Sequence, residues 1–257
     1  MNTETKTNLS KVPAVNPGFW TIKILATTLG EVGGNAVTLT LGFGYLAGTA
    51  IFGSLLVLLL VAQLCSDRFH PILYWAVITA TTLAGTTLAD FCDRSLGIGY
   101  LGGSLILLAS VLATLFLWNR TLGTVAVETV GTPKAEGFYW ATIMFSQTLG
   151  TALGDWMADS TGLGYEGSAL LILVALTGVT ALFFGTRVSR PALFWAAFVL
   201  TRPLGATLAN TLDKPPASGG LGIGDLTLSG LLALAMVVCV RLIPQRAGRH
   251  PAQADAA

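Results

Sequence analysis

The sequence predicts an all-α fold, a polytopic membrane protein with eight transmembrane helices formed by four parallel two-helix repeats. The first observation behind this prediction is the composition. The mean hydropathy is +0.71 and only 11% of the residues are charged, whereas soluble domains carry about 25% charged residues. The second observation is a set of long apolar runs at 46–64, 101–118, 168–184 and 226–240. Their lengths approach the ~20 residues that a spanning helix needs.

The third observation is a repeated pattern, which sets the order of the elements. Each copy opens with an aromatic pair, and the pairs are Phe19-Trp20, Tyr74-Trp75, Tyr139-Trp140 and Phe194-Trp195. A glycine follows ten residues after each tryptophan, an Asn or Asp follows fifteen residues after it, and a Gly-x-Gly turn comes next. A fixed pattern of this kind indicates one structural unit used four times.

Each repeat supplies one helix before its Gly-x-Gly turn and one after it, because glycine adopts the positive φ that ends a helix at low cost. The predicted helices are 19–39, 45–64, 72–93, 100–118, 138–158, 165–184, 192–212 and 225–243. An even number of helices per repeat gives all four copies the same orientation. The membrane domain is 17–243, with repeats at about 17–65, 71–118, 137–185 and 191–243, between an N-terminal segment (1–16) and a tail (244–257) that we expect to be disordered.

Basic residues predict the orientation in the membrane. Ten lie on the side of both termini, and two, Arg94 and Lys214, lie at the opposite ends of the helices. The ten are Lys6, Lys11, Arg68, Arg120, Lys134, Arg187, Arg190, Arg241, Arg246 and Arg249. Because cytoplasmic loops carry the excess of Lys and Arg, both termini are predicted to be cytoplasmic. The polar residues 1–16 contain no signal peptide, so we expect the first helix to direct insertion.

The four tryptophans and four Gly-x-Gly turns, between about residues 17 and 243, resemble a family of bacterial inner-membrane proteins built from four tandem repeats of unknown function. The resemblance implies an eight-helix protein of the bacterial inner membrane. It implies no established chemistry and no catalytic residues. The fourth copy departs from the pattern, because Pro215–Gly219 lengthens its turn and Asp225 replaces a tyrosine.

Polar residues recur in register on the first helix of each repeat. The residues seven positions past the tryptophans are Thr27, Thr82, Gln147 and Arg202, and those eleven positions past are Glu31, Thr86, Thr151 and Ala206. The residues fifteen positions past are Asn35, Asp90, Asp155 and Asn210, and those eighteen positions past are Thr38, Asp93, Ala158 and Asp213. Steps of four, four and three keep these columns on one helical face. Since lipid cannot solvate a carboxylate, we expect the four odd-numbered helices to cluster with the apolar even-numbered helices around them. The pattern leaves open whether the odd helices are broken near Gly30, Gly85, Gly150 and Pro203.

The polar columns predict an ion path. Glu31 lies about 16 Å along its helix from Trp20, near the bilayer midplane. An acidic external mouth, formed by Asp93, Asp159 and Asp213 with Glu166 nearby, raises the local cation concentration. The candidate path residues are Glu31, Asn35, Asp90, Asp155, Asn210, Arg202, Thr27, Thr86, Gln147 and Thr151. Oxygen ligands suit hard cations, with Glu31, Asp90 and Asp155 as the candidate metal ligands.

Structural explanations compete with this interpretation. Thr, Asn and Gln also hold membrane helices together, and a predicted Glu31–Arg202 pair is either a gate or a permanent lock. Lys23 is expected to extend to the interface, and the tryptophans to anchor the protein at the bilayer surface.

Three functions remain from the sequence: a transporter of a small cation, with or without proton coupling; a passive cation channel; or a non-transporting sensor or scaffold. No enzyme motif and no CxxC spacing is present, so we expect no enzymatic activity, no cofactor and no nucleic-acid partner. The expected partners are membrane lipids and a small cation or proton, and the oligomeric state is left open.

Overall fold

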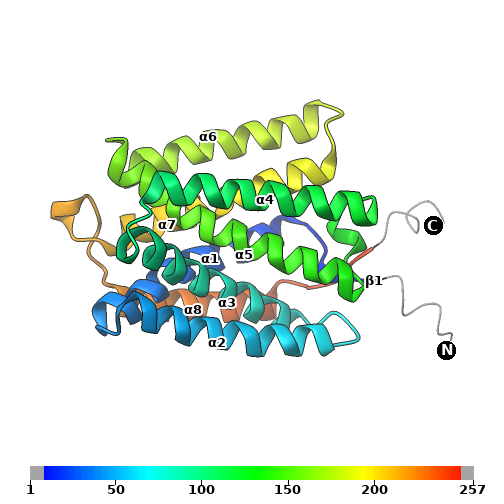
Figure 1. Ribbon diagram of the computed structural model, residues 1–257, viewed down its shortest axis with the longest axis horizontal. Coiled ribbons are helices and arrows are strands. Elements are labelled where there is room, and N and C mark those ends of the chain that lie inside the picture. Colours follow the sequence, from blue (N-terminus) through cyan, green and yellow to red (C-terminus); the bar gives the residue numbers. More distant parts are fainter. Residues whose placement is uncertain (1–8, 250–257) are drawn as a thin grey trace.

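The computed structural model describes residues 9–249, and this part of the chain is almost entirely helical (Figure 1). Its α-helices are α1 (Pro17–Asn35), α2 (Gly44–Cys65), α3 (Pro71–Asp90), α4 (Tyr100–Leu122), α5 (Pro133–Asp155), α6 (Gly164–Gly185), α7 (Arg190–Asp213) and α8 (Asp225–Leu242). The all-α fold class is therefore confirmed. The odd helices are continuous through Gly30, Gly85, Gly150 and Pro203, which answers the question the sequence left open.

Local sequence explains where the odd helices begin. Each has a proline in its first turn, where the missing N–H costs no hydrogen bond. At α1 the side chain of Asn16 accepts the Phe19 N–H at 3.0 Å, and at α5 the side chain of Thr132 accepts the Ala135 N–H at 3.3 Å. These are N-caps that satisfy otherwise unpaired donors.

The ends of the odd helices carry a feature that the sequence did not reveal. Three of them continue into a five-residue π-helix: η2 (Ala36–Thr40), η3 (Phe91–Ser95) and η5 (Trp156–Ser160). Two positive-φ glycines then reverse the chain in every copy, as at Gly42 (φ 72°) and Gly44 (φ 76°). In the fourth copy the 3₁₀ turn η6 (Pro216–Ser218) follows α7 in the place of a π-helix, so the predicted departure of this copy is confirmed.

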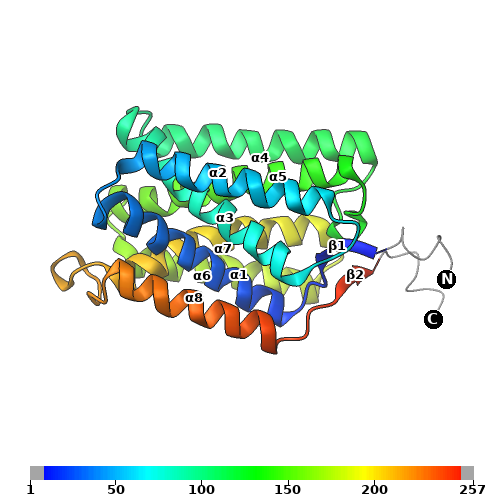
Figure 2. The ribbon, with the colours of Figure 1, turned by 90° about the horizontal axis from the view of Figure 1, so that it is seen from below.

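The inner helices form a closed ring. Helix α1 packs against α3 and α7, and α5 packs against the same two helices from the other side. Each outer helix lies on the inner helix of the next repeat: α2 on α3, α4 on α5, α6 on α7, and α8 back on α1 (Figures 1 and 2). The expected inner cluster of odd helices is thus present. Because α8 covers α1, the last repeat closes the ring on the first.

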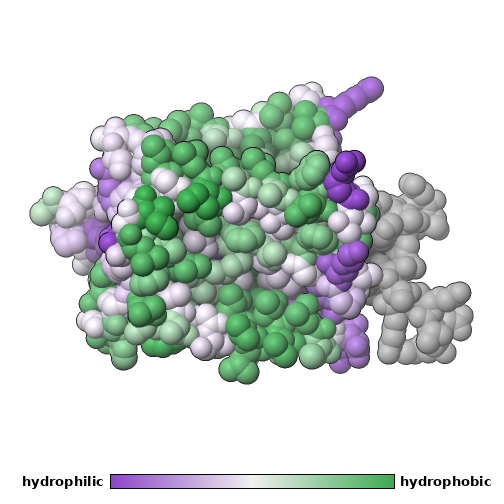
Figure 3. Space-filling view, viewed as in Figure 1, coloured by the Kyte–Doolittle hydropathy of each residue, from purple (hydrophilic) through white to green (hydrophobic). Residues whose placement is uncertain are grey.

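The outer surface is apolar. The even helices expose large side chains such as Leu58 (71% exposed) and Phe184 (81% exposed), and in the face shown in Figure 3 the hydrophilic residues gather at the two ends. Six helical segments are long and apolar enough to cross a membrane: 44–65, 71–95, 100–122, 164–185, 190–213 and 225–242. Helices α1 and α5 do not meet that criterion, because their sequences carry Lys23, Glu31, Gln147 and Asp155. The chain therefore has the character of a multi-pass membrane protein.

The two terminal segments meet at one end of the ring. Strand β1 (Leu9–Pro13) pairs antiparallel with β2 (Ala247–Arg249), and the turn η4 (Val127–Thr129) supports them, since the Ser10 hydroxyl donates to the Val127 carbonyl at 2.7 Å. The expectation of a wholly disordered tail is wrong for residues 247–249, because strand pairing satisfies their backbone groups. Residues 250–257 lie outside the described part of the chain.

Candidate functional site

The inner faces of α1, α3, α5 and α7 enclose a polar column, which we call the seam. It contains the ten predicted path residues, each at most 5% exposed: Glu31, Asn35, Asp90, Asp155, Asn210, Arg202, Thr27, Thr86, Gln147 and Thr151. The structure therefore brings the predicted residues of four repeats together on the axis of the ring.

Glycines allow the inner helices to approach closely enough to form the seam. A Cβ on Gly30 would collide with Thr82, one on Gly85 would press on Gln147, one on Gly150 would collide with Arg202, and one on Gly205 would collide with Thr27. In every case the neighbour belongs to the next repeat around the ring. The glycine ten residues after each tryptophan thus leaves the space in which a polar side chain of the next inner helix packs.

This contact predicts a position-specific loss of stability. We expect Gly150→Ala to lower the free energy of unfolding by about 1–3 kcal/mol, because the new methyl group overlaps the Arg202 side chain and Pro203. Gly178→Ala on outer helix α6 is the matched control, since no atom lies within 4 Å of its Cβ position. Denaturant unfolding of the purified protein in detergent measures both. Equal stability of the two variants would contradict the close crossing.

Arg202 occupies the middle of the seam and contacts all three other inner helices. Its Nη2 donates to Glu31 Oε2 at 3.3 Å, to Thr151 Oγ1 at 2.7 Å and to the hydroxyl of Thr86, and Nη1 donates to the Thr27 carbonyl at 3.2 Å. The predicted Glu31–Arg202 ion pair is present. Both partners are almost completely buried, so neither charge is solvated by bulk water. One guanidinium group therefore joins α1, α3, α5 and α7.

A second guanidinium group binds the next layer. Arg94, in η3, contacts Asp90 Oδ1 through Nε at 2.9 Å and Asp155 Oδ2 through Nη2 at 2.9 Å. The rings of Tyr45 and Tyr100 lie beside it, with centroids 6.0 and 5.6 Å from Cζ. The sequence predicted no place for Arg94 in the ion path, although its i,i+4 spacing from Asp90 was a usable signal of this contact.

The guanidinium groups of Arg94 and Arg202 contact all three candidate metal ligands. Arg94 binds Asp90 and Asp155, and Arg202 binds Glu31, so all three carboxylates have guanidinium partners. Between residues 9 and 249 there is no group of three His, Cys, Asp or Glu side chains that could hold a metal ion.

The end of the seam opposite the termini differs from the expected open acidic mouth. Asp159 is exposed, but Asp93 and Asp213 are only 7% and 6% exposed. Asp93 is covered because its carboxylate lies against Gly103 of α4. Asp225, which replaces the tyrosine of the other copies, accepts the Thr40 hydroxyl at 2.6 Å and so ties α8 to η2. Asn35 and Asn210 make no side-chain hydrogen bond to any residue that the structure describes.

Lys23 is buried, contrary to the prediction that it extends to the membrane interface. It is 0% exposed and does not reach an interface. Its Nζ lies 3.4 Å from Gln147 Oε1 and 4.1 Å from the centroid of the Phe198 ring. No carboxylate within residues 9–249 lies within ion-pair distance of it. The prediction failed because residue 23 is one turn before Thr27 and shares its face, which points into the ring.

An aromatic belt closes the seam at the end near the termini. The first aromatic of each pair packs on the tryptophan of the next repeat: Phe19 on Trp75 (5.5 Å), Tyr74 on Trp140 (5.7 Å), Tyr139 on Trp195 (6.0 Å) and Phe194 on Trp20 (5.7 Å, ring centroids). Within the belt the hydroxyls of Tyr74 and Tyr139 are 2.5 Å apart. Trp75, Trp140 and Trp195 are at most 4% exposed, so the expected membrane anchoring is wrong for these three.

Comparison with protein families identifies the repeat. A model described as Repeat of Unknown Function (DUF347) matches residues 18–69, 73–124, 138–189 and 193–244. The chain belongs to this DUF347 repeat family. Each DUF347 match contains one inner and one outer helix, so the repeat divides the chain in the loops after α2, α4 and α6. A search of the curated proteins and of the solved structures returned no match.

Proposed function

We propose that this DUF347 protein is a transporter of a small cation in the bacterial inner membrane, coupled to protons through the seam. All eight helices cross the bilayer in this proposal. Helices α1 and α5 lie along α3 and α7 in one ring, so a membrane that surrounds six helices also surrounds these two. The 19 residues of α1 extend over about 28 Å, close to the ~30 Å of a hydrocarbon core.

The arrangement of charge supports cytoplasmic termini. Two basic residues whose side chains the structure describes, Arg94 and Lys214, lie at the end of the ring opposite β1 and β2. Eight such residues lie at the end that holds β1 and β2: Lys11, Arg68, Arg120, Lys134, Arg187, Arg190, Arg241 and Arg246. This is the bias expected for a cytoplasmic face. The aromatic belt is then on the cytoplasmic side, and the Asp90–Asp155 layer is toward the outside.

One observation carries the proposal: between the aromatic belt and the layer that Arg94 binds, the seam contains three basic and three acidic side chains, with Asp93 and Asp213 beyond them at its outer end. The six are Lys23, Arg94 and Arg202 against Glu31, Asp90 and Asp155, and all but Arg94 are at most 4% exposed. Each charge at the centre of a membrane helix costs roughly 2.5–3.5 kcal/mol on insertion scales. Hydroxyl and amide groups alone suffice to join membrane helices, so holding helices together does not explain this set.

The geometry supports an order of events. A cation approaching from outside meets a single layer, in which Asn35 and Asn210, whose side chains lack partners in the described chain, lie at the level of Asp90 and Asp155 with Arg94. Protonation of Glu31 removes its negative charge and weakens its hold on Arg202. The loss of this ion pair leaves Arg202 held only by the Thr27 carbonyl and the hydroxyls of Thr86 and Thr151, and in this proposal the weaker link loosens the ring. Opening of the aromatic belt then gives access to the cytoplasm.

Ion flux in proteoliposomes tests the proposal. Monovalent and divalent cations are screened with and without a pH gradient, and we expect saturable flux that responds to the gradient. The variant Asp90→Asn with Asp155→Asn should lose at least about tenfold, because acidic clefts raise local cation concentration by roughly 10–10³. Asp67→Asn, at an exposed position in the loop between α2 and α3 on the side of the termini, is the control and should retain flux.

The outcomes separate the alternatives. Single-channel currents that do not respond to the pH gradient would establish a passive channel instead. Absence of flux for every cation, from protein shown to be folded, would leave the sensor or scaffold interpretation, in which the Arg202 contacts form a permanent lock. We assign the protein no enzymatic role.

A further inference from the structure

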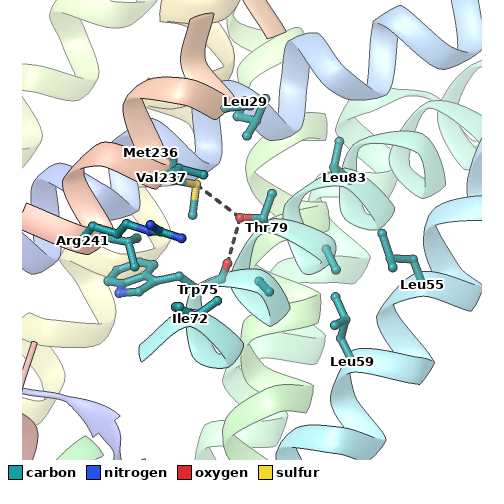
Figure 4. Close-up of a pocket in the computed structure, with 14 residues that line it drawn as sticks. Leu29, Leu55, Leu59, Ile72, Trp75, Thr79, Leu83, Met236, Val237 and Arg241 are labelled. Atoms are coloured by element: carbon teal, nitrogen blue, oxygen red, sulfur yellow. Dashed lines mark hydrogen bonds between the residues drawn. The ribbon is translucent and has the colours of Figure 1, made fainter. Parts of the chain in front are cut away.

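An apolar groove runs along the outside of the ring between α2 and α8. It encloses about 400 Å³, within the range of roughly 300–1,000 Å³ of small-molecule pockets. Leu55 and Leu59 of α2 form one wall, Met236 and Val237 of α8 form the other, and Trp75 of α3 lies on the floor (Figure 4). The groove exists because α2 packs on α3 while α8 packs on α1, which leaves a space between the two outer helices.

Polar groups in the groove are few, and only one is both charged and free. The Thr79 hydroxyl is engaged, since it donates to the Trp75 carbonyl at 2.8 Å and lies 3.4 Å from Met236 Sδ. The indole N–H of Trp75 donates to Gln245 Oε1 at 3.1 Å. Arg241 is exposed and forms no ion pair or hydrogen bond with residues 9–249. It lines the groove at the end near the last turn of α8, beside Trp75 (Figure 4).

We propose that this groove binds one anionic phospholipid, with an acyl chain between α2 and α8 and the phosphate on Arg241. Three observations support this occupant. The walls are apolar along the length of the groove, the groove faces outward where lipid surrounds a membrane protein, and its one free cation lies at the end that carries most of the basic residues. Basic groups between membrane helices at the cytoplasmic face are suited to anionic headgroups.

A second groove provides a comparison within the same molecule. It encloses about 500 Å³ between α1, α6 and α7, and its lining includes Trp20 and Arg190. Arg190, however, already contacts the Phe183 carbonyl and lies over the Phe183 ring, 4.2 Å from its centroid. Because its guanidinium group is engaged, we expect the groove at Arg241 to hold the anionic headgroup more strongly.

Native mass spectrometry of the detergent-solubilised protein tests the site, with phosphatidylglycerol and phosphatidylcholine as probes. We expect wild-type protein to retain one phosphatidylglycerol per chain in preference to phosphatidylcholine. Arg241→Gln should lower that retention about fivefold, the effect of one basic residue at a membrane surface. Arg246→Gln is the control, because Arg246 is exposed but does not line the groove.

A second variant tests the acyl-chain part of the site. Ala233 is exposed and lines the groove, so Ala233→Phe should fill it without disturbing the ring and should displace the same lipid. Equal retention by the Arg241→Gln and Arg246→Gln variants would overturn the headgroup assignment. Equal retention by wild type and the Ala233→Phe variant would overturn the groove assignment. A mass showing a second chain in place of lipid would identify the groove as a contact between copies.

Discussion

Replacing Arg202 with methionine is expected to destabilise the protein by about 3–5 kcal/mol, the cost of leaving a buried charge without its partner. The substitution removes the ion pair with Glu31 and leaves that carboxylate 2% exposed in the middle of the seam. It also removes the hydrogen bonds to α3 and α5, where Thr86 and Thr151 lose their donor. Unfolding by denaturant in detergent measures the loss.

A double-mutant cycle identifies the ion pair as the cause. Adding Glu31→Gln to Arg202→Met removes the unpaired charge, so at least about 2 kcal/mol of the lost stability should return. Arg187→Met, at an exposed position, should change stability by no more than about 0.5 kcal/mol. If the Arg202→Met variant were as stable as the Arg187→Met variant, Arg202 would not join the inner helices.

Water access to the outer layer of the seam is the second large effect, and it follows from the proposed cation path. In a protein whose Cys65, Cys92 and Cys239 are replaced by serine, Asn210→Cys should react with a small membrane-impermeant thiol reagent added from the outside. Asn210 lies in the outer layer of the seam and its side chain has no partner in the described chain. Ile143→Cys should not react, because it lies twelve residues, or about 18 Å, closer to the belt on the equivalent helix and is 0% exposed.

The controls separate a hydrated seam from a dry one. Leu58→Cys, on the lipid-facing surface of α2 and 71% exposed, should remain unreactive because the bilayer covers it. Labelling of Asn210→Cys at that same low level would show that the seam is dry, as expected if the polar residues only join helices. Labelling of Ile143→Cys would show instead that the Arg202 layer does not block the seam.

The helix order and the composition of the seam could be predicted because the repeats reveal their own register. Once the tryptophans are aligned, Glu31, Asp90, Asp155 and Arg202 fall on one face, and a membrane leaves that face only the interior of the ring. Repetition also revealed the departure at Asp225. The Glu31–Arg202 contact followed because a buried guanidinium needs an acidic partner.

The rest of the site depends on features that have no periodic signal. Which inner helix each outer helix covers is one of them, because α2 is apolar on all sides and its sequence therefore does not distinguish α1 from α3, the helix on which it packs. The π-helix η3 places Arg94 between Asp90 and Asp155. The i,i+4 spacing signals only the contact to Asp90, and not the one to Asp155 on another repeat. The tryptophans and Lys23 looked interfacial because they lie near helix ends. They are buried because each aromatic pair packs on the next and closes the belt beyond Lys23.

Proton-coupled cation flux in proteoliposomes, measured for wild type beside Glu31→Gln and Glu166→Gln, tests the central claim most directly. Both variants make the same chemical change, but Glu31 is buried against Arg202 and Glu166 is exposed at the start of α6. We expect Glu31→Gln to lose flux on the order of 100-fold, the effect of removing a proton-transfer group, while Glu166→Gln transports like wild type. Wild-type flux from the folded Glu31→Gln variant would contradict the account.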